Sequence, residues 1–276
     1  MTGRTDDGTG VFADGRDAWL SRRANLRNVV RQELVARQLA AHLGAPAAKV
    51  LDVGAGHGEQ SLRLARRGYT VVALDPDPKM RQAFEAAAST EPDDVRDRIT
   101  LLAGGLGRLP EAVQAQRFDL VCCHGVLMYL ADPRPAVVQL CDLVAPGGLV
   151  SLLARNADAL ALRPGLRGRW AEVLTMLDAA TEPNPSYLNE LGVTARADRL
   201  EQLASYVTGR RMHVEAWYGV RLLTDRAGVD EPVPSDPAQL GVLLDAEERL
   251  GRTDPYRRLA PLLHLLGRRD LPAVGP

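Results

Sequence analysis

Short apolar runs alternate with amphipathic segments along the first half of the chain. Segments with apolar residues at helical spacing lie at 59–67, 77–88 and 135–144. Strands that alternate with helices are joined by right-handed crossovers, which place parallel strands in one sheet with helices on both faces. The pattern therefore predicts a doubly wound α/β domain. The runs that have the length of buried strands lie at 49–53, 70–74, 99–103, 118–124 and 149–154.

The segment before this core follows a different pattern. Residues 17–43 carry apolar side chains at helical spacing and predict one N-terminal helix, which Gly44 and Pro46 end. Residues 1–16 are polar and rich in Gly and Asp, so we expect a flexible tail. We treat residues 17–276 as a single domain.

The alternation of strands and helices breaks after the fifth strand. Residues 156–190 hold several arginines and prolines but no strand pattern, and we expect a partly helical insertion that caps one edge of the sheet. Residues 199–207 predict a helix and residues 213–223 a strand, whereas residues 259–266 fit either a strand or a helix.

Composition narrows the class of protein. The 276 residues carry a formal net charge of −1, so no overall field attracts nucleic acid and any basic footprint must be local. Cys122, Cys123 and Cys141 lack the spacing of a disulfide framework or a metal site, so we expect no metal. The adjacent Cys122 and Cys123 lie in an apolar run, which predicts core positions for them. No apolar run has membrane-spanning length and no leader pattern opens the chain, which predicts a cytoplasmic protein. The oligomeric state stays open.

The stretch VLDVGAGHGE joins the first predicted strand to a helix through three glycines. A turn at the carboxyl end of such a strand needs small residues, because the backbone must approach a ligand closely. Asp75 ends the second predicted strand 21 residues after Gly54, at the position where an acid accepts hydrogen bonds from a ribose diol. The arrangement indicates a nucleotide-like ligand.

The third glycine decides between ligands. A dinucleotide loop beginning at Gly54 needs glycine at position 59, but that residue is Glu59, whose carboxylate would repel a pyrophosphate. No Gly-Lys-Ser/Thr follows, which excludes a P-loop. S-adenosylmethionine carries an adenosine and a cationic sulfonium but no phosphate, and it is compatible with both the loop and Asp75.

Four successive stretches resemble the motifs of class I S-adenosylmethionine-dependent methyltransferases. They follow in the family's order over residues 49–153 and read VLDVGAGHGE, ALDPDPKM, FDLVCCHGVLMYLADP and LVAPGGLVSL. The resemblance implies a Rossmann-like sheet of seven strands whose last strand is antiparallel. It implies that Gly54, Ala55 and Gly56 face the methionine part of the cofactor and that Asp75 binds the ribose.

The same resemblance implies how the adenine is held. Pro76, directly after the acid, takes the position that packs on the adenine. The family commonly has an acid near the end of strand three, but here the matching position is Gly105. The resemblance therefore implies a backbone contact to the adenine amino group, with Leu106 beside it.

The chain also resembles, over most of residues 24–269, the bacterial tRNA 5-carboxymethoxyuridine methyltransferases, which esterify a carboxylate on a wobble uridine. This resemblance implies that Arg27 reaches the carboxylate of S-adenosylmethionine, that His124 lines the cofactor, and that Arg155 and Asn156 lie on the substrate side. The chain departs from the family in its near absence of Lys and in its insertion. The similar stretches are ANLRNVVRQEL, CHGVLMYLADPR, SLLARNADAL, YGVRLLTD and LLDAEERLGRTDPYRRLAPLLHLLGRR.

Each of these side chains also has an interpretation that needs no ligand. Arg27 fits a solvated helix position, although a guanidinium also binds a carboxylate with two hydrogen bonds. His124 fits a structural histidine or a general base. Arg221 fits an exposed strand position, or it holds the substrate's carboxylate while Tyr218 stacks on a base.

The insertion allows two interpretations as well. Arg163, Arg167, Arg169 and Trp170 form either a basic and aromatic patch for an anticodon loop or a solvated helix face.

Three hypotheses for the function remain open. The first is an S-adenosylmethionine-dependent methyltransferase acting on a carboxylate of a modified tRNA uridine, which is ionised at neutral pH and needs a cation such as Arg221 rather than a base. The second is a small-molecule O- or N-methyltransferase with the insertion as a lid; a hydroxyl acceptor would need a base such as His124. The third is a non-enzymatic protein that binds S-adenosylmethionine or a nucleotide.

Overall fold

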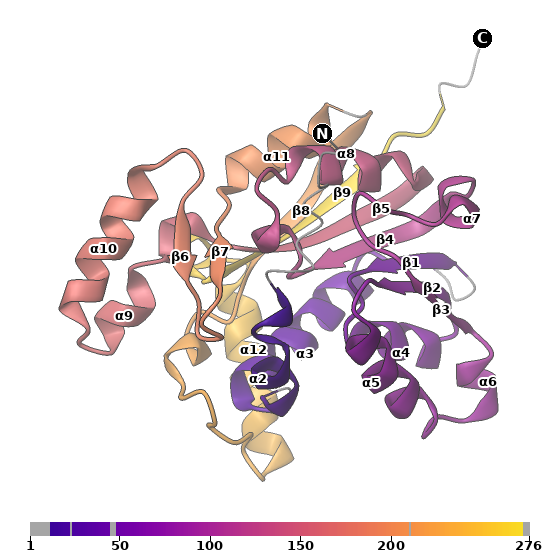
Figure 1. The fold of residues 1–276 in the computed structure, drawn as a ribbon. Helices are drawn as coiled ribbons and strands as arrows, with labels where there is room; N and C mark the ends of the chain where they lie inside the picture. Colours follow the sequence, from indigo (N-terminus) through magenta and orange to yellow (C-terminus); the bar gives the residue numbers. More distant parts are fainter. Residues whose placement is uncertain (1–11, 23, 45–47, 210, 273–276) are drawn as a thin grey trace.

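A seven-stranded sheet forms the centre of the computed structural model, which describes residues 12–22, 24–44, 48–209 and 211–272 (Figure 1). The strand order is β3-β2-β1-β4-β5-β9-β8, and β9 runs antiparallel to both of its neighbours, β5 and β8. This topology confirms the doubly wound α/β fold with an antiparallel last strand. The strands of the sheet are β1 (Lys49–Val53), β2 (Thr70–Asp75), β3 (Ile99–Ala103), β4 (Phe118–His124), β5 (Val144–Arg155), β8 (Met212–Val220) and β9 (Leu262–Arg269).

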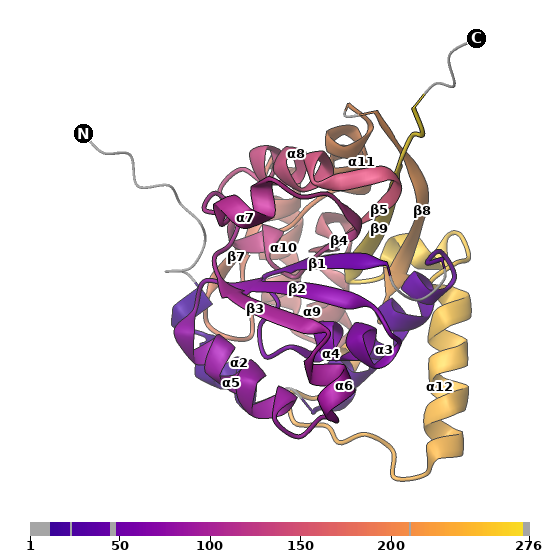
Figure 2. The same cartoon turned by 90° about the vertical axis from the view of Figure 1, so that its right-hand side faces the viewer.

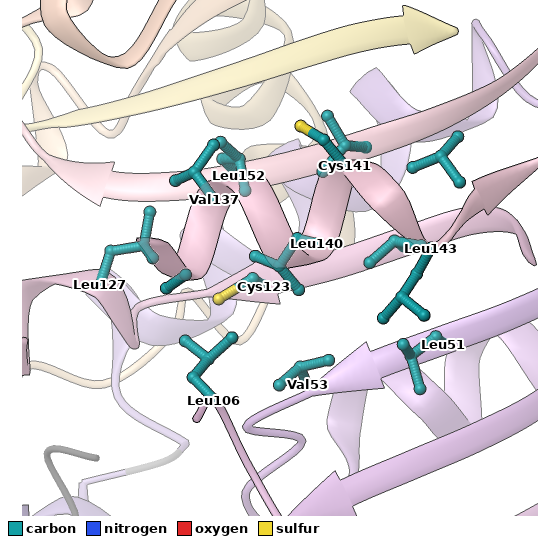
Figure 3. Close-up of a cluster of buried hydrophobic side chains, with 14 of the residues drawn as sticks. Leu51, Val53, Leu106, Cys123, Leu127, Val137, Leu140, Cys141, Leu143 and Leu152 are labelled. Atoms are coloured by element: carbon teal, nitrogen blue, oxygen red, sulfur yellow. The ribbon is translucent and has the colours of Figure 1, made fainter. Parts of the chain in front are cut away.

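Helices cover both faces of the sheet, because successive strand residues point to opposite sides. Leu51 and Cys123 belong to one buried cluster, and their neighbours Val50 and Cys122 belong to the other. Figures 1 and 2 show the helices in two layers, and Figure 3 shows the first cluster between α8 and the strands. The helices of the first face are α7 (Glu111–Gln114), α8 (Arg134–Asp142) and α11 (Leu200–Thr208), and those of the second are α3 (Leu26–Ala40), α4 (Glu59–Arg66), α5 (Pro78–Ala88) and α12 (Pro237–Leu250).

Most of the predicted elements are confirmed within a few residues, and the differences have local causes. The short helix α6 (Asp93–Arg96) and the helix α12 were not predicted. Helix α8 ends at Asp142 rather than Val144, because Val144 already pairs with Phe118 at the start of β5. The last segment, 259–266, is mainly strand, since β9 follows the short 3-10 helix η4 (Tyr256–Leu259). Cys122 and Cys123 are buried, as expected, and so is Cys141.

The prediction of one N-terminal helix over 17–43 is wrong. The chain forms α2 (Arg16–Ser21) and then α3, which begins after the N-cap Asn25. The Asn25 side chain accepts a hydrogen bond from the backbone nitrogen of Asn28, and this cap starts a new helix. Residues 1–11 of the expected tail lie outside the described residues; the ring of Phe12 lies 5.5 Å from that of Tyr129.

The insertion after β5 is partly helical, as predicted, but it also contains a strand that was not. It begins with the 3-10 helix η2 (Ala157–Ala159) and continues as α9 (Leu162–Leu166) and α10 (Trp170–Thr181). The strand β6 (Ser186–Leu188) then pairs antiparallel with β7 (Thr194–Arg196). A three-residue strand is too short to produce a readable alternation. The helices and this hairpin lie together at one end of the molecule (Figure 1).

Candidate active site

A cavity of about 1030 Å³ opens at the carboxyl ends of the parallel strands. Its wall combines the segments that follow β1, β2, β4, β5 and β8 with residues of the N-terminal helices and of the insertion. This is the edge of an open α/β sheet where the strand order reverses and where ligands bind. The cavity is therefore the candidate active site.

The glycine loop after β1 forms one wall of the cavity. Gly54 and Gly56 have φ angles of 74° and 60°, which side chains rarely adopt. A Cβ atom on Gly54 would lie 2.2 Å from a methyl carbon of Val126. The backbone nitrogens of Gly54 and Ala55 both donate to the carbonyl oxygen of Leu74, at 2.8 and 2.9 Å. The loop is thus held tightly against β2 and the segment after β4, with its backbone facing the cavity.

Asp75 ends β2 beside this loop and lines the cavity. Its carboxylate accepts hydrogen bonds from the backbone nitrogens of Gly56, at 2.8 Å, and Asp77, at 2.9 Å. Burial raises the pKa of the Asp75 carboxyl, although these two hydrogen bonds counteract part of that rise. A carboxylate accepts about four hydrogen bonds, so Asp75 retains capacity for the two hydroxyls of a ribose.

The residues expected near the adenine, Pro76, Gly105 and Leu106, lie in different places. Pro76 lines the cavity, and Gly105 packs behind it, because a Cβ on Gly105 would lie 3.4 Å from the Pro76 ring. Leu106 is buried in the core with Val53 and Cys123 rather than in the cavity wall (Figure 3). The structure therefore places both Gly105 and Leu106 outside the cavity lining. For Leu106 the reason is that burial of its apolar side chain in the core is favourable.

Asp52 is a cavity residue that the motif comparison missed. It lies on β1 just before the glycine loop, 2% exposed, and accepts a hydrogen bond of 2.7 Å from the Ser61 hydroxyl. Burial raises the pKa of the Asp52 carboxyl to about 6, although the hydrogen bond from Ser61 acts to lower it. An acid followed by a glycine loop in VLDVGAGHG was the available signal.

Four buried arginines meet at the opposite side of the cavity, around the carboxylate of Asp225. Arg221 lies 2.8 Å from Asp225, Arg27 lies 3.5 Å away, and Arg155 and Arg163 each approach it to 4.0 Å. All four guanidinium groups line the cavity. Burial raises the pKa of the Asp225 carboxyl, but Arg221 and the other arginines outweigh burial and lower it overall. We call these four arginines the arginine cluster.

A second carboxylate, that of Glu190, also contacts the arginine cluster. It lies in the turn between β6 and β7 and forms ion pairs with Arg27 and Arg163. Burial alone would raise the pKa of Glu190, but the hydrogen bond from Arg163 and the charge of Arg27 lower it to about 2. Four guanidinium groups thus face two carboxylates, which leaves two positive charges unbalanced.

The arginine cluster also has unused hydrogen-bond donors. The Nε atoms of all four arginines are buried and have no hydrogen-bond partner among the residues that the structure describes. Each of these arginines is more than nine-tenths buried. Buried donors of this kind are normally satisfied, so their presence at a cavity indicates an anionic ligand.

The backbone explains why Arg221 reaches the cavity. The predicted strand 213–223 ends at Val220, and Arg221 has a φ angle of 69°, in the left-handed region. A bulky residue in that conformation is strained, and such strain gathers at functional sites. The turn directs the side chain toward Asp225, four residues further on. The i, i+4 spacing in RLLTD was the sequence signal for this pair.

Two residues expected on the substrate side lie elsewhere. Asn156 is 1% exposed, and its amide donates to the carbonyl oxygens of Arg258 and Ala260 at 2.9 and 2.8 Å. Tyr218 shares a hydrogen bond of 2.6 Å with His42. Neither side chain is part of the cavity wall, so Arg155 and Arg221 are the members of the expected substrate set that line it.

Aromatic rings that sequence reasoning missed complete the wall. Tyr187 on β6 lies beneath the guanidinium of Arg155, at 5.3 Å, and Trp19 on α2 lies under Arg31, at 5.1 Å. Tyr129, after β4, also lines the cavity. Trp19 and Tyr187 come from segments with no recognisable motif, whereas Tyr129 lies in the stretch FDLVCCHGVLMYLADP. Only the fold brings the three together.

The expected basic patch of the insertion is divided by the fold. Arg163 points into the cavity as part of the arginine cluster. Arg167 donates to the carbonyl oxygens of Arg226 and Ala227. Arg169 and Trp170 remain exposed, with Arg169 in an ion pair of 2.8 Å to Glu172. Arg169 also borders the cavity that Arg163 lines, whereas Arg167 is turned toward the backbone after β8.

Across residues 12–22, 24–44, 48–209 and 211–272, no group of three or more His, Cys, Asp and Glu side chains is arranged to hold a metal ion. In the same ranges, no helix has both the length and the apolar character that crossing a membrane requires.

Comparison with known proteins agrees with the geometry of the cavity. Residues 51–152 match the family described as "Methyltransferase domain". The chain is 32% identical over 169 residues to a ubiquinone biosynthesis O-methyltransferase of Psychrobacter cryohalolentis. The matched region covers 59% of this chain and 63% of that protein. A glycopeptide N-methyltransferase solved with S-adenosyl-L-methionine shares the fold with a TM-score of 0.53 at 16% identity, over 88% of this chain and 94% of that one.

The fold, the cavity and these matches define an S-adenosylmethionine-dependent methyltransferase of class I. The chain is further similar to the tRNA 5-carboxymethoxyuridine methyltransferase of Escherichia coli strain K12, with 25% identity over 264 residues and 92% of each chain. The residues present are compatible with the cofactor, because the close-packed glycine loop offers backbone contacts and the Asp75 carboxylate offers hydrogen-bond acceptors for a diol.

Proposed function

We propose that this enzyme methylates a carboxylate, on a modified uridine at the wobble position of a tRNA. The observation that carries the proposal is the arginine cluster, whose four guanidinium groups exceed the neighbouring carboxylates by two charges. Two carboxylates from outside the protein would balance this excess: one from the amino-acid part of the cofactor and one from the acceptor. Buried arginines suit this task because their planar groups bind carboxylates with paired hydrogen bonds.

The two halves of the cavity divide the ligands between them. We assign the cofactor to Gly54, Ala55, Gly56, Asp75 and Pro76, with Arg27 on its carboxylate and His124 beside it. We assign Arg155 and Arg221 to the acceptor. Gly105 supports the adenine side only from behind Pro76, and Leu106 supports it from the core.

The chemistry requires little more than positioning. S-adenosylmethionine supplies a methyl group activated by the sulfonium, and the methyl–sulfur electron pair returns to sulfur as the new oxygen–carbon bond forms. The acceptor carboxylate is already ionised at neutral pH, so no protein base removes a proton. Arg221 and Arg155 hold and orient the carboxylate, and the enclosed cavity limits water around it. His124 is unsuited to act as a base, since burial lowers its pKa to about 3.

The tRNA acceptor is supported by the similarity to the Escherichia coli enzyme over 92% of both chains. Mass spectrometry of tRNA from a strain that lacks this gene tests it. We expect the unmethylated acid of the wobble uridine to accumulate and to become an ester when the purified enzyme and S-adenosylmethionine are added. An unchanged tRNA pool would contradict the tRNA assignment.

A second candidate is a small-molecule O- or N-methyltransferase. The insertion supports it, because Arg163, Met176 and Tyr187 extend the cavity wall over the acceptor side. The similarity to ubiquinone biosynthesis O-methyltransferases supports it as well. Incubating the enzyme with methyl-labelled cofactor and either bulk tRNA or a small-molecule extract separates the two candidates, since the label follows the true acceptor.

A further inference from the structure

A chain of four polar side chains crosses the sheet beneath the cavity. His124 on β4 shares a hydrogen bond of 2.8 Å with the Ser151 hydroxyl on β5, and Ser151 shares another of 2.8 Å with Nε2 of His264 on β9. Nδ1 of His264 then meets the amide oxygen of Gln38 on α3, at 2.7 Å. Ser151, His264 and Gln38 are fully buried, and none of the three lines the cavity.

The end of this chain at Gln38 sets the direction of every hydrogen bond in it. The Gln38 amide is assigned with its oxygen toward Nδ1 of His264, which leaves its Nε2 with no partner among the described residues. An amide oxygen only accepts, so in this orientation Nδ1 of His264 carries the hydrogen. Nε2 of a neutral His264 is then an acceptor and receives the single hydrogen of the Ser151 hydroxyl. The Ser151 oxygen must in turn accept from Nε2 of His124. His124 is therefore the tautomer with hydrogen on Nε2 and a lone pair on Nδ1.

Both rings are neutral in the folded protein. Burial lowers the pKa of His124 to about 3, and the nearby Arg31 adds to this effect. Burial also lowers the pKa of His264 well below its ordinary value. A neutral imidazole has one donor and one acceptor, so the direction of the chain cannot be reversed at one ring alone. The positive charge of Arg31 further favours a lone pair, rather than a hydrogen, on the free nitrogen of His124.

His124 lines the cavity at the carboxyl end of β4, next to the segment whose Val126 packs on the glycine loop. Its Nε2 is occupied by Ser151, and no hydrogen bond from the described part of the chain reaches Nδ1. We propose that Gln38, Ser151 and His264 are positioning residues that hold Nδ1 of His124 as an acceptor for the ammonium group of S-adenosylmethionine. This inference concerns the cofactor and does not depend on the identity of the methyl acceptor.

The tautomer is measurable in the free protein. With ¹⁵N-labelled histidine, nuclear magnetic resonance distinguishes protonated from unprotonated ring nitrogens. We expect hydrogen on Nε2 of His124 and none on its Nδ1. Gln38→Met removes the acceptor at the far end, so the chain is free to run in either direction and His124 becomes a mixture of tautomers. Gln38→Glu keeps an oxygen at that place and is expected to restore the wild-type tautomer.

Cofactor binding provides the second readout. S-adenosylhomocysteine carries the same ammonium group, and its Kd from calorimetry should rise by about two- to tenfold in Gln38→Met, because only part of the population presents the acceptor. An analogue of S-adenosylhomocysteine without the amino group should bind equally to both proteins. Gln202→Met on α11, outside the chain of hydrogen bonds, is the matched control and should bind both ligands normally.

Several outcomes would overturn the proposal. Hydrogen on Nδ1 of wild-type His124 would do so without any variant. So would a Gln38→Met protein whose tautomer and affinity are unchanged, or one that loses the same affinity for the analogue without the amino group. The last result would show that Gln38 acts on the fold of the site rather than through the orientation of His124.

Discussion

The cofactor side and the acceptor side of the cavity are built in opposite ways. On the cofactor side, consecutive residues such as Gly54–Gly56 and Asp75 offer backbone and carboxylate contacts at the ends of adjacent strands. On the acceptor side, charged side chains come from β5, α9 and the turn after β8. The first side depends on local backbone geometry and the second on long-range charge.

The buried acids show the same contrast. Asp52, on the cofactor side, has no cation paired with it in the structure's described ranges, and burial raises its pKa. Asp225 and Glu190, on the acceptor side, are surrounded by arginines that lower theirs despite burial. The cofactor side is thus compatible with a cation, and the acceptor side with anions. The following predictions test this contrast, beginning with the largest expected effect.

Arg221→Ala should lower kcat/KM for a carboxylate acceptor by about a hundredfold or more, because truncating one member of a buried charge pair costs about 2–5 kcal/mol. The Kd for S-adenosylhomocysteine should stay unchanged in calorimetry. Arg226→Ala, in the same turn but exposed, is the matched control and should keep full activity. An equal loss of cofactor binding in Arg221→Ala would contradict the division of the cavity.

Asp52→Asn should stabilise the protein in a pH-dependent way. The folded pKa of about 6 lies above the ordinary value of 3.8, so the ionised form is disfavoured by folding and the cost grows as pH rises through this window. The gain should be small near pH 4 and reach about 3 kcal/mol at pH 8. Urea unfolding of both proteins at these two pH values measures it; a gain that is independent of pH would show that burial of the charge is not its cause.

Asp75→Asn should raise the Kd for S-adenosylhomocysteine by about ten- to a hundredfold, since hydrogen bonds to a charged group contribute about 1.5–3 kcal/mol. The loss should be the same whichever acceptor is used, because Asp75 lies on the cofactor side. Asp93→Asn, an exposed position on α6, is the control. Unchanged cofactor affinity in Asp75→Asn would remove the diol assignment.

Glu190→Gln should give the smallest effects. It should strengthen binding of an anionic acceptor and lower the free energy of unfolding. Removing this carboxylate leaves Arg27 and Arg163 without their partner, so the KM for an anionic acceptor should fall by about two- to fivefold through stronger attraction. Glu190 is partly exposed, so the loss of stability at neutral pH should be below about 1 kcal/mol. Because its pKa is lowered, that loss should vanish as pH falls toward 2. A higher KM would mean that Glu190 helps to bind the acceptor.

The contrast also explains which features the sequence could predict. The alternation of strands and helices, the glycine loop and Asp75 depend on neighbours along the chain, and all were found at the correct positions. The break before α3 was missed because Asn25 acts through a single capping hydrogen bond, which leaves the apolar spacing unchanged. The same holds for the hairpin β6–β7, whose three-residue strands carry no periodic pattern.

The acceptor side was only half predictable. Arg27 and Arg155 were named from the resemblance to a family, and Arg221 was named as a candidate to hold the substrate's carboxylate. Arg163 was named only as part of a basic and aromatic patch, and Glu190 and Asp225 were not named. Arg163 and Glu190 reach the cluster because the insertion folds back over the sheet, which no local pattern encodes, whereas the spacing of Asp225 from Arg221 was visible in the sequence. Tyr218 is a different case: its strand position was correct, but its side chain forms a hydrogen bond with His42, just after α3, and is not part of the cavity wall.

The most direct test of the central claim is the chemical nature of the transferred methyl group. Enzyme and methyl-labelled S-adenosylmethionine are incubated with bulk tRNA or a small-molecule extract, and the labelled product is treated with mild alkali. A carboxylate acceptor predicts an ester, so the label should leave as volatile methanol, and Arg221→Ala should deposit little label at all. A label that survives alkali would identify an N-methyl or ether product and contradict the assignment of the arginine cluster to an acceptor carboxylate.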